Sequence, residues 1–272
     1  MKLNRVLIVI KLHAGDAACA DRNAGRALDK MHAAALSAVE RSLSAMKIEY
    51  GISSREEIPA RFKADLIVPV GGDGTFLAAA HAAGNVPLLG VNASPDSSVG
   101  FFCAAKASDF TSFIERICEG RIKPLNLPLI ETTIDKKAIA CMALNDVLFA
   151  ADSPAEAARY TLKVGDKKET QRSSGIWIAA GPGSTAAINA AGGKAMPIES
   201  RRIQYLVREP CPMPGSRYNL TRGILPAGAS IEIFSETKRA SVYVDGHGHS
   251  FRVPRGSTIS CRIANQSLSV FL

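Results

Sequence analysis

One glycine-rich loop in the sequence has a composition suited to phosphate chemistry. Gly71-Gly72-Asp73-Gly74-Thr75 follows the apolar run Leu66 to Val70 and precedes a helix-like stretch, Phe76 to Ala83. Glycines let the backbone approach a polyphosphate closely, and free N–H groups at a helix N-terminus supply partial positive charge. Because an aspartate there would repel phosphate, we expect Asp73 to act as a general base on a hydroxyl or to contact Mg²⁺ and its waters. The alternative is that Asp73 only caps the helix.

Other kinds of site are disfavoured by the composition. The sequence has no G-x-x-x-x-G-K-[ST] motif, no G-x-G-x-x-G after its first strand, and no C-x-x-C spacing among its six cysteines. The net charge of +8 suits anionic ligands, but the basic residues are dispersed, so nucleic acid is not an expected partner. The apolar run Val6 to Ile10 is too short for a signal sequence or a bilayer span, so we expect a cytoplasmic protein with no membrane partner.

The elements that must position the loop alternate between strand and helix. Strands are expected at Val6–Lys11, Ile48–Ile52, Leu66–Val70 and Leu88–Val91, and helices at 24–46, 76–83 and 110–119, the last capped by Ser108 or Asp109. This order predicts an α/β N-terminal domain with a doubly wound parallel sheet, over residues 1–122.

After Gly120 the pattern changes to short alternating strands. Residues 123–272 are therefore predicted to form a mainly antiparallel β domain, interrupted by one helix from about Ser184 through Ala191. Whether the last strand returns to the first domain is left open. A hairpin is expected between Val244 and Phe251, and is favoured over a metal site at His247 and His249.

Four further motifs follow the loop in order. They are Leu89-Gly90-Val91-Asn92, Leu144-Asn145-Asp146-Val147, Gly183-Ser184-Thr185-Ala186 with Gly192-Gly193, and Val244-Asp245-Gly246. The glycine loop alone is shared by NAD kinases, lipid kinases and phosphofructokinases, but the whole set resembles the NAD kinase family. Arg172-Ser173-Ser174-Gly175 and Leu206-Val207-Arg208-Glu209-Pro210 are most similar to its divergent, mitochondrial-type branch.

The resemblance implies phosphorylation of the adenosine ribose 2′-hydroxyl of NAD by Mg-ATP, giving NADP. It implies Asp73 as the base, with Gly72, Gly74 and Thr75 at the phosphates and Asn92 at the nucleotide. Asn145 and Asp146 would hold ribose hydroxyls, and Thr185 and Ala186, with Ser184 nearby, would line the adenine-side pocket. No side chain is assigned as a protein-borne metal ligand, and Mg²⁺ is expected to accompany ATP. The family also implies a homodimer.

Three positions depart from the family pattern and keep alternatives open. Asp146 replaces a glutamate, Ala187 a tyrosine, and Ser174 an aspartate. The alternatives are a lipid or small-alcohol kinase of the same superfamily, or a non-catalytic sensor of NAD(P) or another nucleotide. The choices between NAD⁺ and NADH, and between ATP and polyphosphate, are also open. Cations expected to neutralise ATP are Arg172, Lys194, Arg201, Arg202 and Arg208.

Overall fold

The chain forms two compact units in the computed structural model, which describes residues 2–11, 22–59 and 63–272. Unit 1 comprises Met1–Asn126 and Leu268–Leu272, and unit 2 comprises Leu127–Ser267. The chain therefore leaves unit 1 after Asn126 and re-enters it at Leu268.

A parallel sheet forms the centre of unit 1. Its strands, in spatial order, are β2 (Glu49–Ser54), β1 (Arg5–Ile10), β3 (Leu66–Gly71) and β4 (Leu88–Leu89). Val270 and Phe271, at the end of β18 (Thr258–Phe271), pair in parallel with β4, and β5 (Val91–Asn92) pairs with β3 and with β6 (Ala105–Lys106). The carboxyl ends of β1, β2 and β3 therefore meet at one edge, where ligands of such sheets bind.

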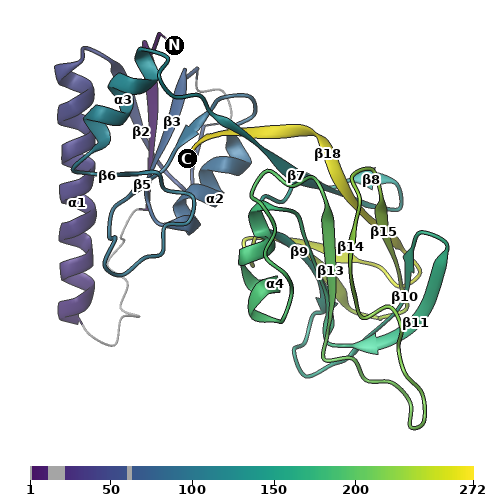
Figure 1. Ribbon diagram of the computed structural model, residues 1–272. Coiled ribbons are helices and arrows are strands. Elements are labelled where there is room, and N and C mark those ends of the chain that lie inside the picture. The colour runs from purple at the N-terminus through teal and green to yellow at the C-terminus, as the bar shows by residue number, and fades with distance from the viewer. Residues whose placement is uncertain (1, 12–21, 60–62) are drawn as a thin grey trace. The chain divides into compact units, whose positions relative to one another are not determined.

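Helices cover both faces of this sheet. Figure 1 shows α1 (Arg22–Ala45) and α3 (Phe110–Cys118) on one face and α2 (Asp73–Ala82) on the other. The alternation of side chains along β1 explains this arrangement, because Val6 and Ile8 join the apolar cluster of α1 and α3, whereas Leu7 and Val9 point the other way. The predicted doubly wound α/β fold is confirmed.

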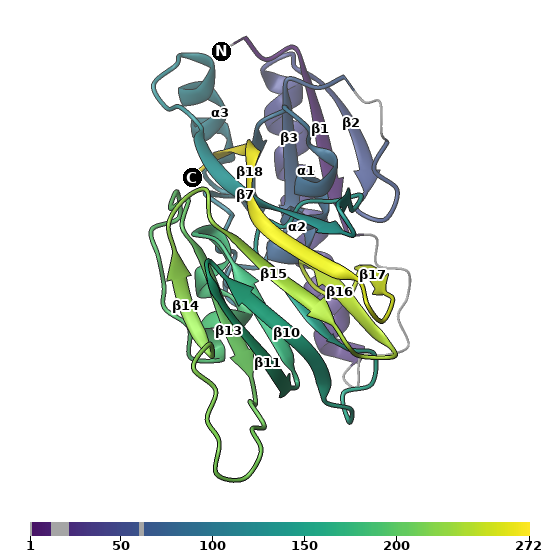
Figure 2. The ribbon, with the colours of Figure 1, turned by 90° about the vertical axis from the view of Figure 1, so that its right-hand side faces the viewer.

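Unit 2 is built from antiparallel strands in two sheets. One contains β11 (Lys167–Ser173), β10 (Ala158–Val164), β15 (Ser230–Ser235) and the first part of β18, and Figure 2 shows β10, β11 and β15 side by side. β7 (Leu125–Ile134) pairs with β18 and with β8 (Lys137–Ala138). The other sheet is β14 (Arg222–Leu225), β13 (Ile203–Arg208), β12 (Gly175–Ala179), β9 (Asp146–Ala151), β16 (Ala240–Val244) and β17 (His249–Val253). A shared apolar cluster that includes Phe149 and Tyr160 joins the two sheets, and the predicted mainly antiparallel character of this region is confirmed.

Several local predictions are corrected. α2 begins at Asp73 rather than Phe76, because Gly72 acts as its N-cap residue. The predicted helix over 184–191 is instead a 3₁₀ turn, Pro182–Thr185, followed by the short α4, Ala187–Ala190. Ala186 has a non-helical ψ of −142° and separates the two.

The predicted strand Leu88–Val91 and the predicted cap of α3 also differ. The strand is divided at Gly90 into β4 and β5. A Cβ at Gly90 would lie 2.6 Å from the Phe102 carbonyl oxygen, so glycine is required at this position. Asp109 is the N-cap residue of α3 but makes no side-chain bond to the helix; its Oδ1 accepts the Lys106 N–H instead. No helix among the described residues is long and apolar enough to cross a membrane.

Candidate active site

Asp73 lies at the carboxyl edge of the unit 1 sheet, in the first turn of α2. Its Oδ1 accepts the backbone N–H of Phe102 at 3.0 Å. Among the described residues, Oδ2 accepts no hydrogen bond. The carboxylate is half-buried and receives a favourable contribution from the helix N-terminus. One oxygen is thus fixed, while the other is available to a ligand.

The position of Phe102 is fixed by ring stacking and by a close backbone approach. Its ring stacks on Phe76 of α2, with centroids 5.1 Å apart and an interplanar angle of 14°. The backbone at Phe102 passes close to Gly90, where any larger residue would collide with it. Because Phe102 is buried and Asp73 belongs to the first turn of α2, the hydrogen bond between them sets the orientation of the carboxylate before a ligand binds.

The glycines of the loop make room for close neighbours. A Cβ at Gly71 would lie 2.5 Å from Oγ1 of Thr75, and one at Gly72 would lie 2.5 Å from Oγ of Ser98. The Thr75 side chain is buried against Gly71, whereas Gly74 is exposed. Of the three predicted phosphate contacts, Gly74 therefore offers the most open backbone surface.

Cys103 was not predicted as a neighbour of this site. Burial and the nearby Asp73 carboxylate raise the pKa of the Cys103 thiol to about 12, so it stays protonated at neutral pH. Its Sγ lies 3.9 Å from the Gly71 carbonyl oxygen. The contact is tertiary and has no signal in the local sequence.

Asn92 ends β5 at the same edge, but its side chain is used within its own loop. Its Nδ2 donates to the Ser98 carbonyl oxygen at 3.2 Å, and its Oδ1 accepts the Ser94 N–H at 3.0 Å. Gly100, with φ of 58°, packs so closely that a Cβ there would lie 2.3 Å from Nδ2 of Asn92. The amide therefore shapes the loop that places Ser98 over Gly72, and a direct contact to the nucleotide stays a prediction.

Asn145 and Asp146 lie in unit 2, at the start of β9, and are held by a residue from the end of β16. The Asp245 carboxylate accepts the backbone N–H groups of Leu144, Asn145 and Asp146 at 2.9, 2.7 and 3.1 Å. The Asp146 carbonyl oxygen in turn accepts the Asp245 N–H at 3.0 Å. Asp245 has a φ of 50°, a conformation that aspartate tolerates better than most residues. The sequence showed Asp245 only as part of a motif, and its role as a backbone clamp follows from the structure.

Asp146 is the most perturbed acid in this region. Burial, and next the negative charge of Asp245, raise the pKa of the Asp146 carboxyl to about 7. Only 6% of the residue is exposed. A carboxyl group with this pKa changes between neutral and charged forms near neutral pH, so it can both donate and accept hydrogen bonds to a diol.

The second glycine segment packs directly on Asn145. A Cβ at Gly183 would lie only 1.5 Å from the Asn145 carbonyl oxygen, so no other residue fits there. Ser184 is fully buried: its Oγ donates to the Gly181 carbonyl oxygen at 2.7 Å and accepts the Met196 N–H at 2.8 Å. Thr185 is exposed and Ala186 is half-buried. The Ser184 hydroxyl is thus engaged in hydrogen bonds within the protein, whereas Thr185 and Ala186 lie at the surface beside the Asn145 segment.

The basic residues predicted to neutralise ATP have varied environments in unit 2. Arg201 donates from Nη2 to the Ala264 carbonyl oxygen at 2.8 Å, and the Arg208 guanidinium lies over the Trp177 ring, 5.6 Å from its centroid. Gly192, Gly193, Lys194 and Arg202 line one pocket of about 330 Å³. None of these contacts tests whether the predicted cations bind the phosphates of ATP, so that role stays a prediction.

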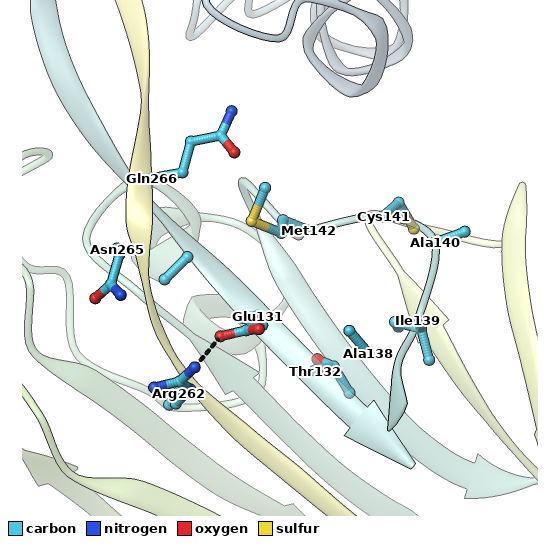
Figure 3. A pocket seen from close by; sticks show the side chains of 11 residues that line it. Glu131, Thr132, Ala138, Ile139, Ala140, Cys141, Met142, Arg262, Asn265 and Gln266 are labelled. Carbon is cyan, nitrogen blue, oxygen red and sulfur yellow. Dashed lines mark ion pairs between the residues drawn. The ribbon is translucent and has the colours of Figure 1, made fainter. Parts of the chain in front are cut away.

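A further pocket in unit 2, of about 350 Å³, contains none of the predicted site residues. Figure 3 shows Glu131 and Arg262 pointing toward one another across part of it, and their ion pair measures 2.6 Å. Cys141 also lines this pocket, and burial together with the charge of Asp245 raises the pKa of its thiol to about 11. The segment from Cys141 leads directly to Asn145, so the pocket adjoins the clamped segment.

Within the described residues, no group of three or more histidine, cysteine, aspartate or glutamate side chains is arranged to hold a metal ion. Asp73 supplies a single carboxylate at the glycine loop. This fits a Mg²⁺ ion that would be held mainly by phosphate oxygens and water, the usual arrangement for a nucleotide-borne ion.

Comparison with known proteins agrees with this geometry. A family profile described as the ATP-NAD kinase N-terminal domain matches residues 26–122. An NADH kinase of Arabidopsis thaliana is 32% identical over 267 residues, covering 89% of this chain and 84% of that protein. The chain belongs to the NAD kinase family. A probable NADH kinase of Oryza sativa subsp. japonica is 31% identical over 230 residues, covering 76% of this chain and 71% of that protein.

Two solved structures support the NAD kinase fold. An NAD kinase from Archaeoglobus fulgidus in complex with ATP superposes with a TM-score of 0.74 at 20% identity, covering 98% of this chain and 93% of that one. Yeast NADH kinase complexed with NADH gives a TM-score of 0.77 at 18% identity, covering 98% and 83%. The predicted family, kinase class and fold are therefore confirmed, while the individual site residues stay predictions.

Proposed function

We propose that this kinase transfers the γ-phosphoryl group of Mg-ATP to the 2′-hydroxyl of the adenosine ribose of NAD or NADH. The observation that carries the proposal is the Asp73 carboxylate within the glycine loop. One of its oxygens is held by the Phe102 N–H, and the other accepts no hydrogen bond from a described residue. A carboxylate fixed in this way among phosphate-attracting amides is suited to deprotonating an alcohol.

The chemistry assigned to Asp73 is the removal of one proton. Its unoccupied oxygen accepts the proton of the 2′-hydroxyl as the ribose oxygen forms a bond to the γ-phosphorus. The bond between the γ-phosphorus and the bridging oxygen breaks, and ADP leaves with that electron pair. Because the protein forms no covalent intermediate, most of the rate must come from positioning and electrostatic stabilisation.

Asn145 and Asp146 are proposed to bind the ribose hydroxyls. Among the described residues, neither side chain has a hydrogen-bond partner, and the Asp245 clamp fixes the backbone of both. The Thr185 and Ala186 surface lies next to this segment and is proposed to contact the adenine. Mg²⁺ is proposed to enter with ATP, held by phosphate oxygens and water, and to neutralise phosphate charge.

We further propose that NADH is accepted in addition to NAD⁺. The support is that the plant relatives from Arabidopsis and Oryza are named an NADH kinase and a probable NADH kinase. The lipid-kinase alternative is not favoured by these relatives. A homodimer and a cytoplasmic location also stay proposals, to be tested by light scattering and by cell fractionation.

The test is incubation of the purified protein with Mg-ATP and either NAD⁺ or NADH, followed by detection of NADP(H) with a dehydrogenase specific for it. We expect product from both acceptors, none after chelation of Mg²⁺, and a large loss in Asp73→Asn. Parallel reactions with polyphosphate identify the donor. Binding of NAD(H) without any turnover would instead support the sensor alternative.

A further inference from the structure

The glycine loop lies in a long stretch of sequence without a permanent cation. From Ala64 to Ala105 the chain has no lysine or arginine, although this stretch includes the whole glycine loop and the Asn92 loop. A bound triphosphate carries several negative charges, and Asp73 adds another beside it. Backbone amides and Mg²⁺ offset part of this repulsion, but a side-chain cation must come from elsewhere in the chain.

Arg55 brings such a cation to the loop from the end of β2. A Cβ built on Gly74 would lie 3.6 Å from Nη1 of Arg55, which is the nearest described atom outside the adjacent residues and the backbone of the same helix. Gly74 is exposed and has no side chain, so the guanidinium faces bare backbone at the surface of the loop. The contact joins positions 55 and 74, which no sequence motif links.

The Arg55 side chain starts from a fixed backbone. Its N–H donates to the Ile10 carbonyl oxygen at 2.8 Å, which continues the pairing of β2 with β1. The turn is closed by the Glu57 N–H, which donates to Oγ of Ser54 at 3.1 Å. Nε of Arg55 donates to Glu56 Oε1 at 2.8 Å. The carboxylate thus engages Nε, the side of the guanidinium opposite the loop-facing Nη1, and restricts the rotation of the group.

We propose that Arg55 binds a phosphate group of the phosphoryl donor through its Nη atoms, at the surface of Gly74. This inference rests on the proposed kinase function. Arginine is suited to this position because its planar guanidinium can donate two parallel hydrogen bonds to phosphate. The Arg55 side chain is 32% exposed, so a phosphate reaches it without any rearrangement of the core. Arg55 then supplies the charge that a P-loop lysine supplies in other nucleotide-binding loops.

The test compares Arg55→Gln with the matched control Arg5→Gln. Arg5 lies on β1, at the opposite edge of the same sheet, and its Nη2 pairs with Glu49 at 2.6 Å. Both changes remove one positive charge and one ion pair at the surface, but only Arg55 is next to the loop. We expect Arg55→Gln to raise the KM for Mg-ATP about tenfold to a hundredfold, the scale of a lost charged hydrogen bond, with little change in the KM for NAD(H). Arg5→Gln should leave both constants within about twofold of the wild type.

Direct binding of ADP, measured by calorimetry, separates this inference from the proposed function. If the wild type binds ADP but forms no NADP(H), the proposed function fails, and weakened ADP binding in Arg55→Gln still supports the phosphate contact. Arg55→Lys keeps the positive charge but lacks the planar guanidinium that donates two parallel hydrogen bonds, so it should show an intermediate ADP affinity. This variant also provides the test if Arg55→Gln does not fold. Wild-type affinity for ADP and wild-type KM for Mg-ATP in the folded variants would overturn the inference. A rise confined to the KM for NAD(H) would also overturn the inference, because it would show that Arg55 binds the acceptor rather than the phosphoryl donor.

Discussion

Replacing Asp73 by asparagine separates the chemical role of this residue from its structural role. In the wild type, Oδ1 of Asp73 accepts the Phe102 N–H at 3.0 Å. The asparagine amide keeps an oxygen that can accept the same N–H, so the loop retains this hydrogen bond. What disappears is the negative charge and the ability to take a proton. Gly72 rather than Asp73 is the N-cap residue of α2, so the remaining structural alternative is that Asp73 only tethers Phe102. That alternative predicts a change in stability and no specific change in chemistry.

The two expected effects differ in size. Loss of the charge weakens one hydrogen bond by about 1 kcal/mol and removes a helix-terminus interaction of about 0.3–1 kcal/mol. The variant should therefore lose about 1–2 kcal/mol of unfolding free energy and remain folded. Loss of a general base reduces kcat by about 10²–10⁴, which corresponds to about 3–5 kcal/mol in the barrier. The kinetic effect should thus clearly exceed the structural one.

Asp109→Asn is a matched control in the same unit. Asp109 is also located at a helix N-terminus, and its Oδ1 accepts the Lys106 N–H at 2.7 Å. Urea unfolding should give similar losses of stability for Asp73→Asn and Asp109→Asn. Steady-state assays at saturating Mg-ATP and NAD(H) should show a low kcat for Asp73→Asn alone. A near-normal kcat in Asp73→Asn, or an equal loss of kcat in both variants, would refute the assignment of Asp73 as the base.

Three further predictions concern unit 2. Asp245→Asn replaces a carboxylate that accepts three backbone N–H groups; urea unfolding should show a loss of about 2–4 kcal/mol, and the KM for NAD(H) should rise because the Asn145 backbone is released. The raised pKa of Asp146, about 7, means that its contribution to stability is full below pH about 4 and is lost progressively as pH rises to about 7. Asp146→Asn should therefore flatten the pH dependence of unfolding between about pH 4 and 7, and an unchanged slope would show that the pKa is not raised. Gly183→Ala places a Cβ 1.5 Å from the Asn145 carbonyl oxygen and should cost about 3 kcal/mol or more, whereas Gly248→Ala, with open space around it, should be nearly neutral in thermal unfolding.

The sequence was informative where chemistry is local. The apolar runs gave β1 and β3 close to their observed bounds, because buried strands between two helix layers need continuous apolar residues. The start of α2 was placed too late, since apolar periodicity begins only at Phe76. The first turn contains Asp73 and Gly74, which are weak helix formers that tertiary contacts hold in place.

The contacts that complete the candidate site were harder to predict, because they join distant parts of the chain. Arg55 follows a short strand in a polar turn, where a lone arginine usually means a solvated residue. Asp245 lies a hundred positions from Asn145, and only the pairing of β16 with β9 brings its carboxylate to that backbone. The prediction of a long helix after Ser184 was wrong for a related reason. The buried Ser184 hydroxyl accepts a hydrogen bond from the distant Met196 N–H, so Ser184 does not begin a long helix.

The double membership of β18 has a consequence for how the protein acquires its structure. Its first residues pair with β15 in unit 2, and its last pair with β4 in unit 1. When only residues 1–126 have been synthesised, β4 lacks the neighbour that β18 provides in the complete structure. An unpaired strand edge can recruit strands from other chains, so we expect the partly synthesised chain to be prone to misassembly until Val270 and Phe271 pair with β4.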